Sequence, residues 1–322
     1  YTSSAFVTGA KLFQTVFGLS YRTGLLVGAA IVVIYTCSGG FKAVCWTDLF
    51  QGIMMFFAII IIPVTVVRMF GGLDTTMETV NAMHPGSFDI IPNGTNISWF
   101  VVVTGLGWGL GYFGQPHILA RFMAIRSSKE VRPARIIAMV WVIISLACAI
   151  MVGIFGVAYF TTPLAEGAHE TIFMELSKQL FHPIIAGVLL SAILAATMST
   201  CDSQLLVTAS AISEDVYKAF LKPTATDKEL INISRVTVVV VAIIAIFIAL
   251  DPNSSIFGLV SYAWAGFGSA FGPTIVLSLY WRRMTRKGAI AGVIAGGVTA
   301  IVWIMLKGLG GIFQIYEIVP GF

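Results

Sequence analysis

The chain has 322 residues, of which 57% are hydrophobic and 11% charged, and its formal net charge is +4. A soluble domain carries about 25% charged residues, so this composition, with a mean hydropathy of +0.92, excludes an ordinary soluble domain. It predicts a membrane protein. The total charge says little by itself, and we expect the bilayer as a partner and no nucleic acid.

Apolar runs of about 20 residues, the length that crosses a bilayer as a helix, recur along the chain. They predict one partial span over about 1–19 and eight full spans over about 23–40, 44–70, 98–125, 134–160, 183–212, 234–250, 255–280 and 288–306. A shorter peripheral helix is expected over about 168–182. Both ends of the sequence look like helices cut short, so we expect residues 1–322 to be a single transmembrane domain from a longer protein.

The connecting segments alternate in charge, which sets the expected topology. Basic residues gather in residues 121–135, 218–235 and 282–287, whereas residues 71–97 have no Lys or Arg. Cytoplasmic loops carry the excess of basic residues, so these three segments should be cytoplasmic. The sequence therefore predicts a multi-pass protein of a plasma membrane.

Asp48 is the first carboxylate that falls inside a predicted span, close to its cytoplasmic end. An acid within a membrane helix is costly and indicates a functional site by default. The alternative is an interfacial acid that reaches water or pairs with Lys42. The sequence leaves both interpretations open.

The predicted span over 98–125 is rich in glycine and contains Gln115 and Pro116. So many glycines with a proline disfavour a continuous helix, and transporters use such breaks to aim backbone groups at substrates and ions. Trp108 and Tyr112 lie among the glycines and could line a small-ligand pocket. The alternative is a glycine-packed helix interface with a proline kink.

The span over 183–212 carries a hydroxyl-bearing face. Ala196, Ser199, Thr200 and Ser203 follow one another at helical spacing, with Asp202 beside them. Oxygen ligands without His or Cys suit a hard cation such as Na⁺. The alternative is that these small residues pack helices closely or bond to the preceding turn.

Three stretches of the chain resemble the sodium/solute symporter family, in particular its proline-transporting branch. They are residues 107–118 (GWGLGYFGQPHI), residues 195–200 followed by 203–206 (AATMST and SQLL), and residues 261–268 (SYAWAGFG). The resemblance covers essentially the whole chain. It implies an all-α, inverted-repeat transporter fold of five plus five core helices, here incomplete because the first two core helices precede the sequence.

The resemblance also implies roles for particular residues. Sodium is expected at the backbone carbonyl of Ala196 and at the hydroxyls of Ser199 and Thr200. The residues matched to the substrate site are Trp108, Tyr112, Gln115, Pro116 and Tyr1. A possible second cation position or exit route comprises Asp48, Asp202 and Ser203.

The resemblance implies a transporter that is not an enzyme and that couples inward Na⁺ movement to L-proline uptake by alternating access. Na⁺ is the coupling ion, and no organic cofactor is expected. One alternative is a symporter of the same family for another small solute. A second alternative is the transporter-like module of a membrane sensor kinase. A channel is disfavoured because the polar residues cluster instead of lining a path.

Overall fold

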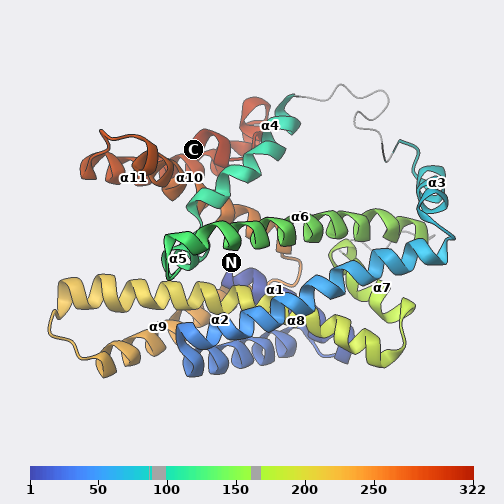
Figure 1. Ribbon diagram of the computed structural model, residues 1–322, viewed down its shortest axis with the longest axis horizontal. Helices are drawn as coiled ribbons and strands as arrows, with labels where there is room; N and C mark the ends of the chain where they lie inside the picture. Colours follow the sequence, from blue (N-terminus) through green and yellow to red (C-terminus); the bar gives the residue numbers. More distant parts are fainter. Residues whose placement is uncertain (87, 89–98, 161–167) are drawn as a thin grey trace. The chain divides into compact units, whose positions relative to one another are not determined.

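A computed structural model describes residues 1–86, 88, 99–160 and 168–322 (Figure 1). These residues are helical and contain no strand, so the predicted all-α membrane class is confirmed. They form two compact units. Unit 1 comprises Tyr1–Phe88 and Ser128–Ile256, and unit 2 comprises Asp89–Ser127 and Phe257–Phe322. The single domain and the five-plus-five repeat remain predictions.

Unit 1 is built around one long helix that carries the hydroxyl-bearing face. Its elements are α1 (Thr2–Phe17), α2 (Tyr21–Met69), α3 (Leu73–Met83), α6 (Ser128–Tyr159), the 3₁₀ turn η2 (Ala168–Thr171), α7 (Ile172–Leu180), α8 (Pro183–Ser210), the π-helix η3 (Ala211–Leu221) and α9 (Asp227–Ile248). Helices α1, α2 and α9 all pack against α8 (Figure 1). The expected peripheral helix is present as η2 and α7.

The buried core of unit 1 explains why α8 is held on several sides. One cluster joins α2, α6, α7 and α8 through Ala58, Ile62, Val152, Leu176, Leu189 and Ala192. A second joins α1 and α7 to α8 through Leu12, Met174 and Leu190. Because lipid is as apolar as these side chains, close van der Waals packing stabilises such contacts between membrane helices, and this packing fixes the rotation of α8.

Helix α2 is interrupted where the sequence placed the boundary between two spans. Gly40 has φ of 64° and ψ of 179° inside this 49-residue helix, a conformation that residues with a Cβ rarely adopt. The interruption lies between the predicted spans 23–40 and 44–70. It redirects the chain just before the turn that carries Asp48.

Unit 2 contains the glycine-rich segment. Its elements are α4 (Trp99–Gly107), the 3₁₀ helix η1 (Trp108–Gly114), α5 (Pro116–Met123), α10 (Ile256–Tyr280, from Phe257 onward), α11 (Arg286–Leu306), the 3₁₀ turns η4 (Lys307–Leu309) and η5 (Gly311–Gln314), and α12 (Ile318–Gly321). The short α12 packs against α4, η1 and α11. It is anchored by the wholly buried Glu317, which forms an ion pair of 2.6 Å with Lys307.

Local capping explains why two helices begin where they do. The side chain of Thr226 accepts a hydrogen bond from the backbone N–H of Glu229, and Thr285 accepts one from Gly288. Such N-caps satisfy an otherwise unpaired backbone donor. Helices α9 and α11 therefore begin before the predicted starts of their spans at 234 and 288.

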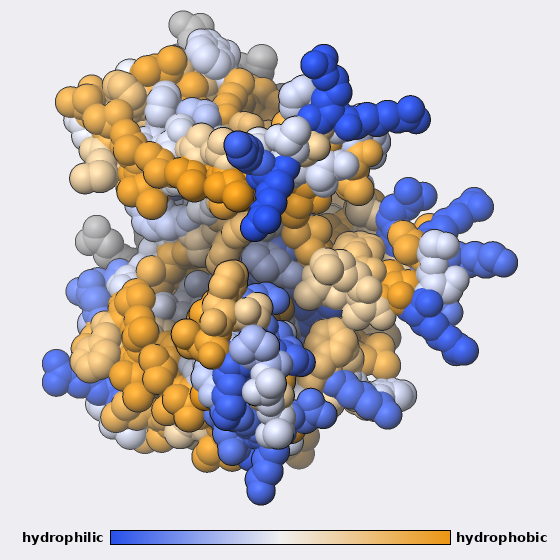
Figure 2. All heavy atoms as spheres, turned by 90° about the vertical axis from the view of Figure 1, so that its left-hand side faces the viewer, coloured by the Kyte–Doolittle hydropathy of each residue, from blue (hydrophilic) through white to orange (hydrophobic). Residues whose placement is uncertain are grey.

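The outer surface of the helices fits a lipid environment. By length and composition, five of the described helices can cross a membrane, namely Tyr21–Met69, Ser128–Tyr159, Pro183–Leu221, Asp227–Ile248 and Arg286–Leu309. Large apolar side chains such as Phe57, Ile137 and Phe247 are 65–70% exposed. Figure 2 shows hydrophobic side chains over much of the face that it draws, with hydrophilic side chains gathered separately. The count of eight full spans remains a prediction.

Candidate functional site

The hydroxyl-bearing face of α8 is regular helix. Ala196, Ser199 and Thr200 are partly buried and lie within little more than one turn of one another. The Ser199 hydroxyl donates to the Ala196 carbonyl at 3.2 Å, a common local bond for serine in a helix. A hydroxyl that donates its proton keeps two lone pairs, so Ser199 can still offer oxygen to a cation. The structure thus brings together the three residues predicted to bind sodium.

One turn further along α8 lies a buried acidic cluster. Asp202 is fully buried and Ser203 is 3% exposed. Ser203 Oγ donates to the Ser199 carbonyl at 2.6 Å and lies 3.3 Å from Asp202 Oδ1. It also lies 3.5 Å from Oδ2 of Asp48 on α2. The three residues predicted as a second cation position are therefore neighbours. The hydrogen bond from Ser203 to the Ser199 carbonyl connects them to the three predicted sodium ligands.

Tyr35 belongs to this cluster, although no motif in the sequence points to it. Its hydroxyl donates to Oγ1 of Thr47 and also interacts with the Asp202 carboxylate. Tyr35 precedes the interruption at Gly40, whereas Thr47 and Asp48 follow it. Because α2 bends at Gly40, the parts of α2 before and after the bend both contact α8 near Asp202 and Ser203. No local sequence pattern predicts this contact.

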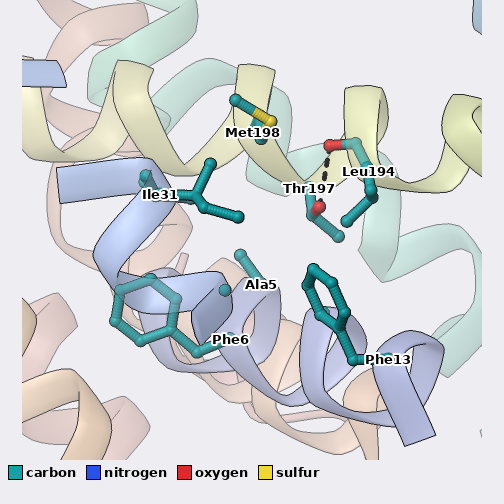
Figure 3. A pocket seen from close by; sticks show the side chains of 10 residues that line it. Ala5, Phe6, Phe13, Ile31, Leu194, Thr197 and Met198 are labelled. Atoms are coloured by element: carbon teal, nitrogen blue, oxygen red, sulfur yellow. Dashed lines mark hydrogen bonds between the residues drawn. The ribbon is translucent and has the colours of Figure 1, made fainter. Parts of the chain in front are cut away.

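A small apolar cavity lies beside α8 in unit 1, between α1, α2 and α8 (Figure 3). Its volume is about 40 Å³, and its lining includes Phe6, Phe13, Ile31 and Met198. The hydroxyl of Thr197, which also lines it, donates to the Leu194 carbonyl of its own helix at 2.8 Å. The rest of the lining is apolar and supplies no other side-chain oxygen to a cation, so Thr197 is not counted among the candidate sodium ligands.

In unit 2 the predicted helix break is confirmed. Helix α4 ends at Gly107, η1 follows, and Gln115 is extended with φ of −80° and ψ of 112° before α5 begins at Pro116. A residue that precedes proline is pushed toward extended conformations, and proline is favoured at the first position of a helix. The Gln115–Pro116 pair therefore sets the position of the break.

The glycines of this segment divide into two groups. A Cβ on Gly111 would lie 1.9 Å from Trp264 Nε1, and one on Gly114 would lie 2.4 Å from the Phe267 carbonyl oxygen. By contrast, Gly109 has no atom within 4 Å of such a Cβ. The broken segment therefore also packs tightly against α10 through its glycines. The helix break and the glycine-packed interface, which were alternatives from the sequence, are both present in the structure.

Aromatic rings gather along the same segment. The ring of Trp108 is nearly parallel to those of Phe257, Trp264 and Tyr316, with centroids 5.5, 5.3 and 6.0 Å away. Tyr112 meets Trp264 edge to face at 4.7 Å and is 39% exposed. Tyr112 thus offers a more open ring than Trp108, whose faces are already stacked.

Gln115 is fully buried, and its amide orientation is fixed by two hydrogen bonds. Its Nε2 donates to the carbonyl oxygens of Gly111 at 3.1 Å and Trp264 at 3.2 Å. Its Oε1 is buried and has no hydrogen-bond partner among the described residues. Buried polar atoms are normally paired, so this oxygen is an acceptor available to a ligand.

Tyr1 and the other predicted substrate residues are assigned to different units of the chain. It precedes α1 in unit 1, where its carbonyl accepts from Ser4 Oγ at 2.7 Å, whereas Trp108, Tyr112, Gln115 and Pro116 belong to unit 2. The neighbouring Thr2 bonds to Cys201 of α8. Tyr1 is therefore close to α8, and its role in substrate binding remains a prediction.

These features define an all-α, multi-pass membrane protein with a helix broken inside an apolar segment. The family model described as "Sodium:solute symporter family" matches residues 1–296, and the chain belongs to this family. The chain is 50% identical to the osmoregulated proline transporter OpuE of Bacillus subtilis and 51% identical to a sodium/proline symporter of Salmonella typhimurium. Both matches cover 100% of the chain but only 65% and 64% of those relatives, so the chain spans less than two thirds of their length.

A solved structure has a similar fold. A Na⁺-coupled sialic acid symporter, described in a substrate-bound outward-open state with a novel Na⁺ site, superposes with a TM-score of 0.71. The match covers 98% of this chain and 69% of the other, at 17% sequence identity. At that identity the likeness establishes the fold alone.

Proposed function

We propose that the full-length protein carries L-proline into the cell together with Na⁺ across the plasma membrane, by alternating access. One observation supports this most strongly. Relatives named as proline transporters or sodium/proline symporters, from Bacillus subtilis, Salmonella typhimurium and Escherichia coli, are about 50% identical to the chain along its whole length. Na⁺ and proline are the transported species, and the protein lies in the lipid bilayer.

The coupling ion binds at the Ala196 carbonyl and the Ser199 and Thr200 hydroxyls. These oxygens are partly buried on a helix held on several sides, so the ion replaces part of its water shell with oxygens that are already positioned. Such a site is worth more than the same oxygens in water, because nothing must be ordered when the ion arrives. Other parts of the protein complete the coordination.

Asp48, Asp202 and Ser203 form a second cation position or an exit route for Na⁺. Two carboxylates that share contact with one hydroxyl repel each other when both are ionised, and a passing cation relieves that repulsion. Ser203 contacts both this cluster and the Ser199 carbonyl. An ion that leaves Ala196, Ser199 and Thr200 can therefore pass directly to the neighbouring carboxylates of Asp48 and Asp202.

Proline binds along the broken segment of unit 2. As a zwitterion it brings a secondary ammonium with two N–H donors, and the buried Oε1 of Gln115 accepts one of them. Its ring packs against Tyr112 at the edge of the cluster that contains Trp108, and Pro116 maintains the break. The absence of a charged side chain from these four residues suits a substrate whose net charge is zero.

The test is uptake of radiolabelled proline by the full-length protein in proteoliposomes, with an inward Na⁺ gradient against an equal K⁺ gradient. We expect uptake only with Na⁺, and inhibition by excess unlabelled proline but not by alanine, glutamate or lysine. Uptake that is equal in K⁺, or inhibited equally by other amino acids, would contradict the proposal. In the second case the data would favour a symporter for a different solute.

A further inference from the structure

We infer that Trp264 of α10 is a positioning residue that holds the broken segment in its substrate-binding form. The inference deepens the proposed function and rests on it for the identity of the substrate. Trp264 is 7% exposed, so it acts through the residues that it contacts. It contacts three of the four proposed substrate residues of unit 2, namely Trp108, Tyr112 and Gln115.

The first link runs from the Trp264 side chain to the backbone at the start of η1. Its indole Nε1–H donates to the Trp108 carbonyl oxygen at 2.8 Å, across 156 residues of sequence. Carbonyl groups near a helix break need partners from outside the helix. Removing the indole donor would leave this carbonyl oxygen without that bond.

The second link runs from the Trp264 backbone to Gln115. The Trp264 carbonyl oxygen accepts one N–H of the Gln115 amide, while Gly111 accepts the other. With both donors engaged, the amide cannot flip without losing two bonds. Trp264 therefore helps to determine where Gln115 Oε1 points.

The third link is the placement of the two aromatic side chains. Trp264 stacks on Trp108 with an interplanar angle of 12° and meets Tyr112 at 85°. The indole can come this close only because residue 111 is glycine, since a Cβ there would lie 1.9 Å from Nε1. Gly111 and Trp264 thus form a matched pair on the two elements.

The experiment compares Trp264→Phe with Trp303→Phe in the full-length protein in proteoliposomes. Phenylalanine keeps most of the apolar packing but removes the indole donor. Trp303 is a matched control, because its indole donates to the Ile315 carbonyl at 3.1 Å elsewhere in unit 2. We expect Trp264→Phe to raise the KM for proline roughly tenfold with little change in kcat or in Na⁺ activation, and Trp303→Phe to leave the KM unchanged.

A second readout separates positioning from general loss of structure. N-Methylglycine keeps the secondary amine and carboxylate of proline but has no ring, so it cannot use a ring-binding wall. We expect Trp264→Phe to reduce the preference for proline over N-methylglycine as a competitor severalfold. Equal weakening of both ligands, or an unchanged KM, would overturn the inference.

A third readout does not depend on proline transport. Tyr112→Cys, placed in a full-length background whose own cysteines are replaced, reports the state of the broken segment through its rate of reaction with a maleimide. We expect Trp264→Phe to change this rate severalfold and Trp303→Phe to leave it unchanged. If the wild type shows no Na⁺-dependent proline uptake, the proposed function fails. The maleimide reaction rate then tests by itself whether Trp264 positions the broken segment. An equal rate in both variants would overturn the inference.

Discussion

Helix α8 and the broken segment of unit 2 place polar groups inside apolar surroundings in two different ways. On α8 the helix is intact, and its polar groups are side chains, of which Ser199 and Ser203 donate to carbonyl oxygens of their own helix. In the broken segment the helix itself is interrupted, and its polar groups are held by Trp264, which is 149 and 156 residues away from its two partners.

The difference predicts how each region responds to change. Because α8 keeps its backbone hydrogen bonds, loss of a side-chain oxygen should impair ion binding and leave the fold intact. Because the broken segment depends on close contact between backbone and side chains, added volume there should disturb the fold and the site together. The following variants of the full-length protein test this contrast.

The largest effect is expected from Gly111→Ala. The new Cβ would overlap the Trp264 indole, and overpacking of this kind costs about 1–3 kcal/mol or more. We expect a lower thermal unfolding midpoint in detergent and loss of proline uptake. Gly109→Ala is the control, because its Cβ meets no atom within 4 Å. Similar behaviour of the two variants would show that the segment does not pack as described.

The double variant Ser199→Ala with Thr200→Ala tests the opposite side of the comparison. Each lost hydroxyl removes an interaction with a charge, worth about 1.5–3 kcal/mol, or roughly ten- to a hundredfold in ion affinity. We expect the Na⁺ concentration for half-maximal uptake to rise at least tenfold, with an unchanged unfolding midpoint.

Thr197→Ala is the matched control for that double variant. It removes a hydroxyl from the same helix, but one that faces the apolar cavity and bonds to Leu194 (Figure 3). Its Na⁺ activation should match the wild type. Normal Na⁺ activation in the double variant would place the sodium site elsewhere.

Trp108→Ala asks whether the aromatic cluster contributes to substrate affinity. Loss of one buried aromatic face costs on the order of 1–3 kcal/mol, so the KM for proline should rise roughly ten- to a hundredfold. Na⁺ binding should remain measurable. Trp99→Ala, at a position that is 57% exposed at the start of α4, should have little effect. Parallel loss of Na⁺ and proline binding would indicate collapse of the segment instead.

Asp48→Asn should have a smaller, kinetic effect. Removing one of two neighbouring carboxylates lowers the attraction for a departing cation, so turnover should slow severalfold and its pH profile should change, while the KM for proline changes little. Asp251→Asn is the control, because Oδ1 of Asp251 accepts from the Asn253 backbone N–H and an amide oxygen can do the same. Normal turnover of Asp48→Asn at every pH would favour an interfacial role for this acid.

The smallest effect is expected from Gly9→Ala on α1. Gly9 lines the apolar cavity and its new Cβ would meet no atom within 4 Å, while alanine favours the helix by about 0.5–1 kcal/mol. A slightly higher unfolding midpoint is expected. Gly24→Ala should lower it, because that Cβ would lie 3.0 Å from the Ala10 carbonyl oxygen. A midpoint lowered by both would show that the cavity does not accept a methyl group.

The sequence by itself determined the features that depend on near neighbours in the chain. Helical spacing placed Ala196, Ser199 and Thr200 on one face of α8, because a helix repeats every 3.6 residues whatever surrounds it. The Gln115–Pro116 pair set the position of the break, because the conformational limits around proline are local. Apolar runs along the chain predicted an all-α protein, and the described residues form helices and no strand.

Only the tertiary structure decided which distant groups meet. Tyr35 and Asp48 reach Asp202 and Ser203 because α2 bends at Gly40 and packs on α8. Trp264 reaches Trp108, Tyr112 and Gln115 because the glycine at 111 admits its indole. Such contacts depend on how helices pack and on which side chains are small enough to permit close approach. Helical spacing and proline geometry act over a few residues of one chain segment and carry no information about which other segment will pack against it.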